Sequence, residues 1–418
     1  MRGKKLATLK TILASLFVMS MVFIMGTATA EAAPAKVTGL KQMDASTTSV
    51  QIQWTPTGTS GYVVEYSQDK VTWETESISK NSDTIYGLNA GSTYFVRVKA
   101  VSNGQYGAYS DIVEVVTAPD VTTQNVVQVD ATSSTVTLSW DPVPGATSYD
   151  VYYGSYESPS LGGSTTQTAY TITGIPADSY FSVFVLPKRT AVTAPNYTAV
   201  YDDIYTYGVI TTGGPLYIDV TDRDPRKKVG SKKNSDYNTF YNTLEIAHGI
   251  ALFADGYEVT VYKSNGKSIK KVVDAPNSIF ATVKNIKTTE TVWVQVRSYT
   301  YINGVKKYGD YSDKLLSVGS PTAKATQKGN GVKISWSKVP GAKKYEVYMS
   351  KSSKSGYKKV KTVKSGTRSV VLNSFKGKKF VKWQNYYYYV KAVGTYGKKK
   401  NAKSDIPYYK YFYFYTKY

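Results

Sequence analysis

The sequence predicts an all-β protein in which tandem antiparallel β-sandwiches follow a signal peptide. The pattern behind this prediction lies in residues 135–153, TVTLSWDPVPGATSYDVYY. Val136, Leu138 and Trp140 alternate toward one face, a turn rich in Pro and Gly follows, and the SYDVYY segment then alternates again. Two alternating segments on either side of a breaker predict two half-buried strands that face one core. The pattern returns three more times, which predicts four domains.

The N-terminal segment, residues 1–33, differs from everything after it. A basic start is followed by an apolar run over 11–26 and then by small residues, with a plausible cleavage point after Ala30 or Ala32. This is the layout of a secretory signal peptide. A membrane anchor is the alternative, but the run is shorter than the about 20 residues that cross a bilayer. We therefore expect an exported protein with no transmembrane span in its mature form.

Residue composition limits the chemistry further. The chain has no cysteine, which excludes disulfides, thiolate metal sites and cysteine nucleophiles. Burial alone must stabilise its domains, and 39 Tyr, 12 Phe and 6 Trp supply the apolar area. Exported proteins without cysteine are typical of bacteria, so we expect a secreted, extracellular protein associated with a cell surface of the Gram-positive type.

The first two repeats share one spacing. Trp54 lies in the first strand of the pattern and Tyr94 lies 40 residues later, and the same spacing separates Trp140 from Tyr180. This places Tyr180 in the role of Tyr94, and we expect a lengthened terminal hairpin after Pro187. The predicted domains cover residues 34–118, 119–214, 215–320 and 321–418.

The third repeat is degenerate. Residues 243–259 align without gaps with residues 135–151, which places His248 at the position of Trp140. In the same way the segment 291–299 places Val292 at the position of Tyr94. Trp140 and His248 are 108 residues apart, whereas Trp54 and Trp140 are 86 apart. The polar segment 222–237 is therefore the expected insertion, because polar segments of this kind form exposed loops.

The fourth repeat restores the pattern as GVKISWSKVPGAKKYEVYMS. Trp336 takes the place of Trp140, and Tyr386 takes the place of Tyr94. These two residues are 50 apart, so we expect an inserted loop around residues 376–384.

These units resemble fibronectin type III domains. The resemblance lies in the Trp of the second strand, the Tyr-x-Val third strand, the Leu-x5-Tyr turn from Leu88 to Tyr94 and the Tyr-x-Val-x-Val-x-Ala sixth strand. It implies immunoglobulin-like sandwiches of seven antiparallel strands arranged in a row, with no cofactor. It also implies a tyrosine corner, in which the Tyr94 hydroxyl bonds to the backbone.

Charge is distributed unevenly along the chain. Lys and Arg number 2 against 8 Asp and Glu in residues 119–214, but 24 against 2 in residues 321–418. The basic last quarter should attract polyanions. The expected partner is an anionic cell-wall polymer or polysaccharide, with a membrane surface, extracellular nucleic acid or a protein as further options. A solvated surface without a partner is the alternative. The candidate lysines are Lys358, Lys359, Lys361, Lys364, Lys398, Lys399, Lys400 and Lys403.

Three loops also repeat. They are NGQYGAYSD at 103–111, NGVKKYGDYSD at 303–313 and TYGKKKNAKSD at 395–405, and by resemblance each joins the last two strands of its domain. Their tyrosines either form exposed platforms for sugars or peptides, or cover the end of the sandwich and pair across the hairpin. These residues are Tyr106, Tyr109, Tyr308, Tyr311 and Tyr396.

The sequence offers little for catalysis or metal binding. His248 is the sole histidine and occupies a core position, so we interpret it as a packing residue rather than a base or ligand. The acidic pairs Asp202 with Asp203 and Asp222 with Asp224 are interpreted as solvated loop residues rather than a glycosidase pair. We therefore predict a non-catalytic exported binding or scaffold protein, whose basic C-terminal domain attaches it to a surface. An accessory or spacer protein of an extracellular polysaccharide-degrading system is the alternative.

Overall fold

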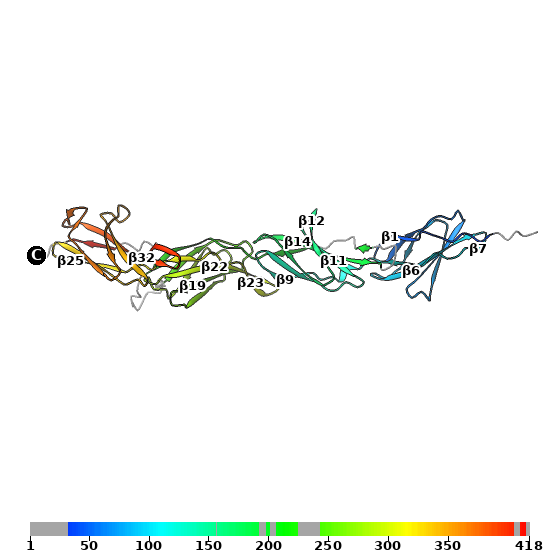
Figure 1. Ribbon diagram of the computed structural model, residues 1–418, viewed down its shortest axis with the longest axis horizontal. Helices are drawn as coiled ribbons and strands as arrows, with labels where there is room; N and C mark the ends of the chain where they lie inside the picture. The colour runs from blue at the N-terminus through cyan, green and yellow to red at the C-terminus, as the bar shows by residue number, and fades with distance from the viewer. Residues whose placement is uncertain are drawn as a thin grey trace, which may run out of the picture.

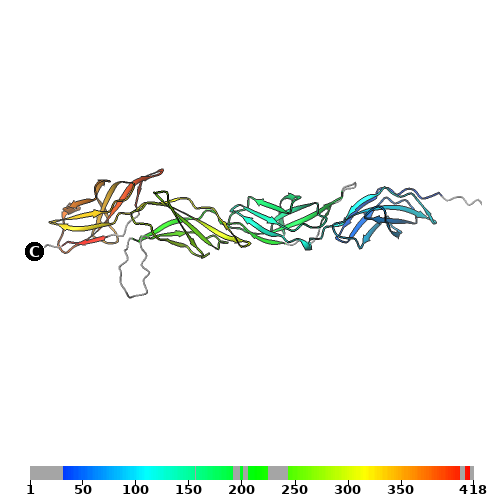
Figure 2. The same cartoon turned by 90° about the horizontal axis from the view of Figure 1, so that it is seen from below.

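Four antiparallel β-sandwiches follow one another in a row and form an elongated rod (Figures 1 and 2). The structure is a computed structural model that describes residues 32–155, 157–191, 198–200, 206–224, 243–404 and 410–414. Nearly all of the expected signal segment thus lies outside the described residues. Each sandwich packs a three-stranded sheet on a five-stranded sheet.

In the first two sandwiches the strand order is the same. The three-stranded sheets are β1 (Lys41–Ala45), β2 (Ser49–Gln53) and β5 (Ser82–Tyr86), then β9 (Val127–Ala131), β10 (Thr135–Ser139) and β13 (Ala169–Thr173). The first five-stranded sheet holds β4 (Glu74–Ile78), β3 (Gly61–Ser67), β6 (Thr93–Ser102), β7 (Gln105–Tyr106) and β8 (Val113–Val116). The second holds β12 (Ser158–Thr165), β11 (Ser148–Ser155), β14 (Tyr180–Thr190), β15 (Thr198–Val200) and β16 (Tyr207–Ile210). A 3₁₀ turn, η1 (Val121–Thr123), lies between them.

The third and fourth sandwiches repeat this order. Their three-stranded sheets are β17 (Ile218–Asp224), β18 (Thr243–His248) and β21 (Phe280–Val283), then β25 (Ala323–Lys328), β26 (Gly331–Trp336) and β29 (Ser369–Leu372). The third five-stranded sheet holds β20 (Ser268–Val273), β19 (Gly256–Lys263), β22 (Val292–Ile302), β23 (Val305–Tyr308) and β24 (Leu315–Ser317). The fourth holds β28 (Lys358–Lys364), β27 (Ala342–Ser350), β32 (Asn385–Tyr396), β33 (Lys399–Lys403) and β34 (Lys410–Tyr413).

The predicted alternating residues form the four cores. In the first sandwich Trp54 meets Tyr62 edge-on, with ring centroids 5.3 Å apart, and the equivalent Trp–Tyr pairs of the second and fourth sandwiches lie at 5.4 and 5.6 Å. In the third sandwich His248 takes the place of the tryptophan, and its ring centroid lies 4.4 Å from that of Tyr257. Val292 is fully buried in that core. The predicted substitutions in the third repeat are therefore confirmed.

The tyrosine corner is present in the first and fourth sandwiches. The Tyr94 hydroxyl accepts a hydrogen bond of 3.0 Å from the Asn89 N–H, and the Tyr386 hydroxyl accepts one of 3.0 Å from the Val381 N–H. Each bond ties the turn before the long strand to the ring that packs beneath it.

In the second sandwich the assignment of Tyr180 to this position is wrong. The strand register pairs Val64 with Val98 in the first sandwich and Val151 with Val185 in the second, so Phe181 is the counterpart of Tyr94. Phe181 packs against the core, whereas Tyr180 is 64% exposed. The equal spacing of 40 residues misled the alignment, because one extra residue lies between Trp140 and the turn before β14.

Both expected insertions fall beside described strands. The segment 376–384 overlaps a small extra hairpin, β30 (Ser374–Phe375) with β31 (Lys378–Lys379), in the fourth sandwich. The segment 222–237 begins at the end of β17, and residues 225–242 lie outside the described part of the chain. The lengthened hairpin of the second sandwich is confirmed, since seven residues separate β14 from β15, whereas two separate β6 from β7.

Hydrogen bonds explain the serine that the three repeated loops share near their ends. The last strand of the sandwich is split, and at the gap the Ser110 N–H donates to Val98 O at 2.8 Å while the Val98 N–H donates to Ser110 Oγ at 3.0 Å. Ser312 and Ser404 make the same two bonds in the third and fourth sandwiches. The hydroxyl replaces the missing backbone acceptor, so a buried N–H stays paired.

Candidate functional site

The predicted lysines occupy the two edges of one sheet. Lys358, Lys359, Lys361 and Lys364 all lie on β28, whereas Lys399, Lys400 and Lys403 lie on β33 and Lys398 lies in the turn before it. The sheet order is β28-β27-β32-β33, so two strands separate the groups. The structure therefore does not gather the eight lysines into one cluster. It places them on the two edge strands of this sheet, β28 and β33. Lys358 and Lys361 pair with the core residues Met349 and Val347, whereas Lys359 reaches Glu346 on the outer face.

A single carboxylate connects the two borders. Glu346 on β27 lies between Lys359 Nζ at 3.7 Å and Lys403 Nζ at 3.1 Å, and it accepts a hydrogen bond of 2.8 Å from the Tyr348 hydroxyl. The Glu346 side chain is only 4% exposed. Burial would raise the pKa of Glu346, but the bonds from Tyr348 and Lys403 outweigh it and hold the pKa below its usual range.

Aromatic rings on the same face were missed by the sequence analysis. Tyr348 stacks on Tyr389 with ring centroids 4.9 Å apart, and Tyr357 contacts Tyr389 at the same distance. Tyr348 and Tyr389 are cross-strand partners of β27 and β32. Their outward positions follow from the alternation of YEVYM and YYYYV, so the signal was present once the core-facing residues were known.

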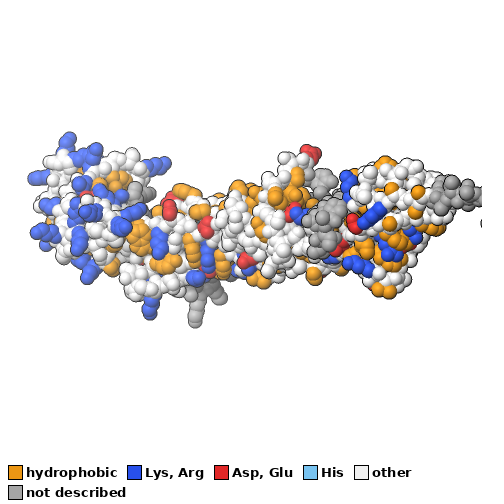
Figure 3. Space-filling model, turned by 45° about the vertical axis from the view of Figure 1, so that its right-hand side comes forward, with side chains coloured by type: hydrophobic (Ala, Val, Ile, Leu, Met, Phe, Trp, Pro, Cys, Tyr) orange, Lys and Arg blue, Asp and Glu red, His pale blue; other side chains and the backbone are white. Residues whose placement is uncertain are grey.

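The surroundings of Glu346 are strongly basic. Residues 321–418 hold 24 Lys and Arg against 2 Asp and Glu. Within the described part of this sandwich Glu346 is the sole carboxylate. Figure 3 shows Lys and Arg side chains gathered over this end of the rod. The field at this surface favours polyanions.

The loop tyrosines of the first sandwich pack on cations. The Tyr109 hydroxyl bonds to Glu65, and its ring lies 4.1 Å from the Arg97 guanidinium. Lys99 Nζ lies 4.9 Å from the ring of Tyr106, which is 58% exposed. Burial would raise the pKa of Glu65, but Tyr109 and Arg97 lower it more strongly.

The third sandwich repeats this arrangement. Arg297 lies between two rings, 3.6 Å from Tyr308 and 4.4 Å from Tyr311, and its guanidinium approaches Glu258 to 2.8 Å. The Tyr311 hydroxyl also donates to Glu258 at 3.1 Å. Arg297 of the same sheet therefore covers part of each tyrosine ring and leaves less of it free for a ligand.

Two of the three repeated loops lie at junctions between sandwiches. In the loop after β22, Lys307 Nζ lies 2.9 Å from Asp130 of the second sandwich, and Asn303 Nδ2 donates to Gln128 O at 2.7 Å. In the fourth sandwich the Tyr396 hydroxyl donates to Pro340 O at 3.2 Å and contacts Thr291 of the third sandwich. The loop with Tyr106 lies at the outer end of the first sandwich, away from the second (Figure 1).

The comparisons with known proteins agree with this architecture. Residues 35–116 match the family model described as the fibronectin type III domain. The first sandwich is a fibronectin type III domain. The other three repeat its strand order, so the chain is an array of tandem immunoglobulin-like β-sandwiches of the fibronectin type III kind.

Two curated relatives match parts of the chain. Chitinase A1 of Niallia circulans is 34% identical over 161 residues, which is 34% of this chain and 22% of that protein. A Kelch domain-containing protein of Sulfurisphaera tokodaii is 25% identical over 322 residues, 72% of this chain and 38% of that protein. The chain thus spans between about a fifth and two fifths of the length of these curated relatives.

Two solved fibronectin type III structures are also similar. The FN1–FN3 domains of chicken CNTN1 are 15% identical with a TM-score of 0.23, and the match covers 69% of this chain and 99% of that one. A two-domain fibronectin type III segment of chicken tenascin is 17% identical with a TM-score of 0.25, and its match covers 42% of this chain and 99% of that one.

The remaining sequence candidates lie apart from this face. His248 is 4% exposed, and burial lowers the pKa of its imidazole. Asp202 and Asp203 lie outside the described residues, and Asp222 and Asp224 lie on β17, where their side chains are not described. Among the residues that are described, no group of three or more acidic or histidine side chains could hold a metal ion. No helix in that part of the chain is long and apolar enough to cross a membrane.

Proposed function

We propose that this protein is an exported, non-catalytic binding or scaffold protein that its fourth fibronectin type III-like domain attaches to an anionic polymer at a cell surface. Cleavage of the segment 1–33 would leave the domains 34–118, 119–214, 215–320 and 321–418 as the mature chain. The outer face around Glu346, with Lys359 and Lys403 on either side, is the proposed contact surface. The loop tyrosines Tyr106 and Tyr308 remain candidates for a weaker second contact, because both rings keep exposed area.

The charge imbalance of the last domain is the observation that carries this proposal. Its single described carboxylate already contacts two lysines, so the described residues of this sheet offer no further acidic side chain to neutralise the other lysines of β28 and β33. Lysines on the two edge strands of one sheet suit a flexible polymer that crosses the sheet. A surface evolved for solubility alone would spread its charges over all four domains.

Retention on purified anionic wall polymer tests the proposal. The full chain is compared with a variant in which Lys358, Lys359, Lys361 and Lys364 become Gln, over a series of salt concentrations. We expect the variant to bind about tenfold or more weakly near 150 mM salt, with a shallower salt dependence, because fewer counterions are released. Nucleic acid of the same charge density, used in parallel, shows whether the polymer class is selected.

The matched control changes four lysines of the third domain, Lys267, Lys271, Lys284 and Lys287, to Gln. It alters the net charge of the chain equally and should leave retention near the level of the unchanged protein. Equal losses in both variants, or retention that ignores salt, would contradict the assignment of the site to the fourth domain.

A second candidate function is an accessory or spacer role in an extracellular polysaccharide-degrading system. The similarity of 161 residues to chitinase A1 favours it. Binding of the full chain to a neutral insoluble polysaccharide such as chitin, unchanged by salt and by the lysine variants, would support this role over the first.

A further inference from the structure

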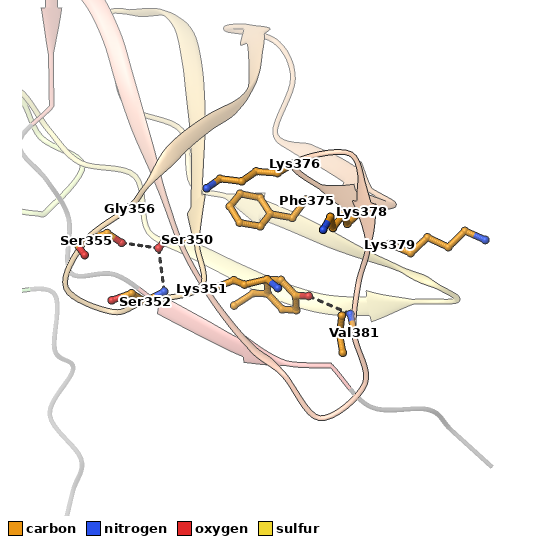
Figure 4. A pocket seen from close by; sticks show the side chains of 11 residues that line it. Ser350, Lys351, Ser352, Ser355, Gly356, Phe375, Lys376, Lys378, Lys379 and Val381 are labelled. Atoms are coloured by element: carbon orange, nitrogen blue, oxygen red, sulfur yellow. Dashed lines mark hydrogen bonds between the residues drawn. The ribbon is translucent and has the colours of Figure 1, made fainter.

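A pocket of about 500 Å³ opens at one end of the fourth sandwich. The loop 350–356, between β27 and β28, forms one wall, and the β30–β31 hairpin forms the other (Figure 4). The hairpin belongs to the segment that makes Trp336 and Tyr386 50 residues apart, where the first sandwich has 40 between its counterparts. An insertion into the repeat therefore builds this wall.

The floor of the pocket is apolar and fixed. Phe375 is 5% exposed and Tyr386 is 1% exposed, and their rings meet edge-on at 6.2 Å. The tyrosine corner from Tyr386 to Val381 holds the hairpin against this floor. Because both rings belong to the core, the floor should exist before any ligand arrives.

The loop wall is held by its own serine. Ser350 Oγ donates to Ser355 O at 2.6 Å and accepts from the Ser352 N–H at 3.0 Å. Figure 4 shows these bonds closing the loop beside the cavity. The backbone of the loop is therefore constrained without a ligand, which lowers the entropy cost of binding.

Four lysines line this cavity, Lys351, Lys376, Lys378 and Lys379. Lys376 Nζ lies 5.6 Å from the Phe375 ring, and Figure 4 shows its side chain extending over that ring toward the loop. Lys351 Nζ lies 6.0 Å from the Tyr386 ring, and Lys378 lines the hairpin wall. In the same view Lys379 points away from the loop.

These lysines have no acidic partner in the described part of the chain. Among those residues, none of Lys351, Lys376 and Lys378 makes an ion pair, and the pocket lining contains no carboxylate. Glu346, the sole described carboxylate of this sandwich, already contacts Lys359 and Lys403. The described residues thus leave these three ammonium groups without an opposite charge, which an anion in the pocket would supply.

We propose that this pocket binds a phosphate-bearing sugar unit of an anionic glycan. Lysine ammonium groups bind phosphate as point charges, and several of them suit its double charge. The exposed side chain of Val381 lines the pocket above the buried ring of Phe375, and it offers the apolar area that suits the C–H face of a sugar ring. The volume lies within the range of small-molecule sites. This inference deepens the proposed function and rests on it in one respect, that the fourth domain meets an anionic glycan.

Calorimetric titration of the full chain with glucose 6-phosphate tests the pocket. We expect a Kd on the order of 0.1–1 mM, as befits a small polar ligand. The double change Lys376→Gln and Lys378→Gln should weaken binding about tenfold or more, because charge-assisted contacts are lost. The matched control is Lys354→Gln, an exposed lysine of the same loop that does not line the pocket, and its affinity should stay within about twofold of the unchanged chain.

Three further ligands separate the sources of affinity. Glucose should not bind measurably, and inorganic phosphate and glucuronate should each bind more weakly than the sugar phosphate. Equal affinity for inorganic phosphate would overturn the sugar part of the proposal, and equal affinity for glucuronate would overturn the phosphate part. No binding of any probe, or equal losses in the control and the double variant, would overturn the site.

The pocket and the polymer face can fail separately. The β28 variant with four Gln residues should lose polymer retention and keep affinity for glucose 6-phosphate. The variant with Lys376→Gln and Lys378→Gln should instead lose more affinity for glucose 6-phosphate than retention on the polymer. A thermal melt of each variant checks that the fold is intact.

Discussion

The third and fourth domains bury a glutamate at the same strand position and surround it with different cations. Glu258 contacts Arg297 at 2.8 Å and Lys270 at 3.3 Å, and Arg297 lies between two tyrosine rings. Glu346 instead contacts Lys359 and Lys403, whose side chains are about half exposed. Arg297 is only 19% exposed. The third domain thus covers its sheet face with an arginine that is mostly shielded, beside one exposed lysine, whereas the fourth domain pairs its glutamate with two half-exposed lysines.

This difference separates stability from binding. A guanidinium stacked between rings has little surface left for a ligand and depends on its carboxylate. A half-exposed ammonium group returns to water at little cost when its partner is lost. The glutamate at this strand position therefore contributes mainly to stability in the third domain, as Glu258, and mainly to the charge of the exposed face in the fourth, as Glu346.

Removal of the two carboxylates gives the largest expected difference. Glu258→Gln leaves Arg297 without its charged partner and should destabilise the third domain by about 2–4 kcal/mol. Glu346→Gln should cost the fourth domain about 1 kcal/mol or less, because its lysines are solvated. Hydrogen exchange of the full chain, followed by peptides from each domain, measures both effects.

The same pair of variants reports on binding. Glu346→Gln raises the net charge of the proposed contact face by one and should strengthen polymer retention slightly at low salt, whereas Glu258→Gln should not change it. Equal destabilisation of the two domains would show that the arginine stack contributes nothing beyond an exposed ion pair.

A pH change should have the next largest effect on the stability difference between the third and fourth domains, because the third has His248 where the fourth has Trp336. Burial lowers the pKa of His248 below its usual value of 6.5. Its stabilisation is complete above that value and is lost as pH falls toward the folded pKa, since the unfolded chain binds a proton that the folded chain excludes. The third domain should therefore lose stability between pH 7.5 and 5.5, while the fourth should not.

The carboxylates act in a lower window. The pKa values of Glu258 and Glu346 are both held below 4.5, so their stabilisation persists at pH 5.5 and is lost in stronger acid.

His248→Phe should remove the loss of stability of the third domain between pH 7.5 and 5.5 in the exchange experiment. A third domain that stays equally stable at both values before the substitution would contradict the buried neutral imidazole.

The sequence predicted cores better than surfaces, and the reason is physical. Alternation in strands constrains every second residue, so His248 and Val292 were located by alignment alone. Counting residues failed at Tyr180, because one extra residue before the turn shifts the count without changing the alternation. The contact of Lys403 with Glu346 depends on sheet order, which brings together residues 57 positions apart. No local pattern contains that information.

The smallest expected effect lies at the junctions made by the repeated loops. Lys307 joins the third domain to Asp130 through an ion pair whose partners are 24% and 51% exposed, so Lys307→Gln should cost about 0.2–1 kcal/mol and leave each domain folded. The bond from Asn303 to Gln128 O remains in this variant.

We expect a slight widening of the range of angles between the second and third domains, seen by small-angle scattering at low salt and absent at 1 M salt. Lys306→Gln, whose ammonium lies over Tyr299 within its own domain, is the matched control. A rod that bends equally in both variants would assign the stiffness of the junction to its backbone and side-chain hydrogen bonds rather than to charge.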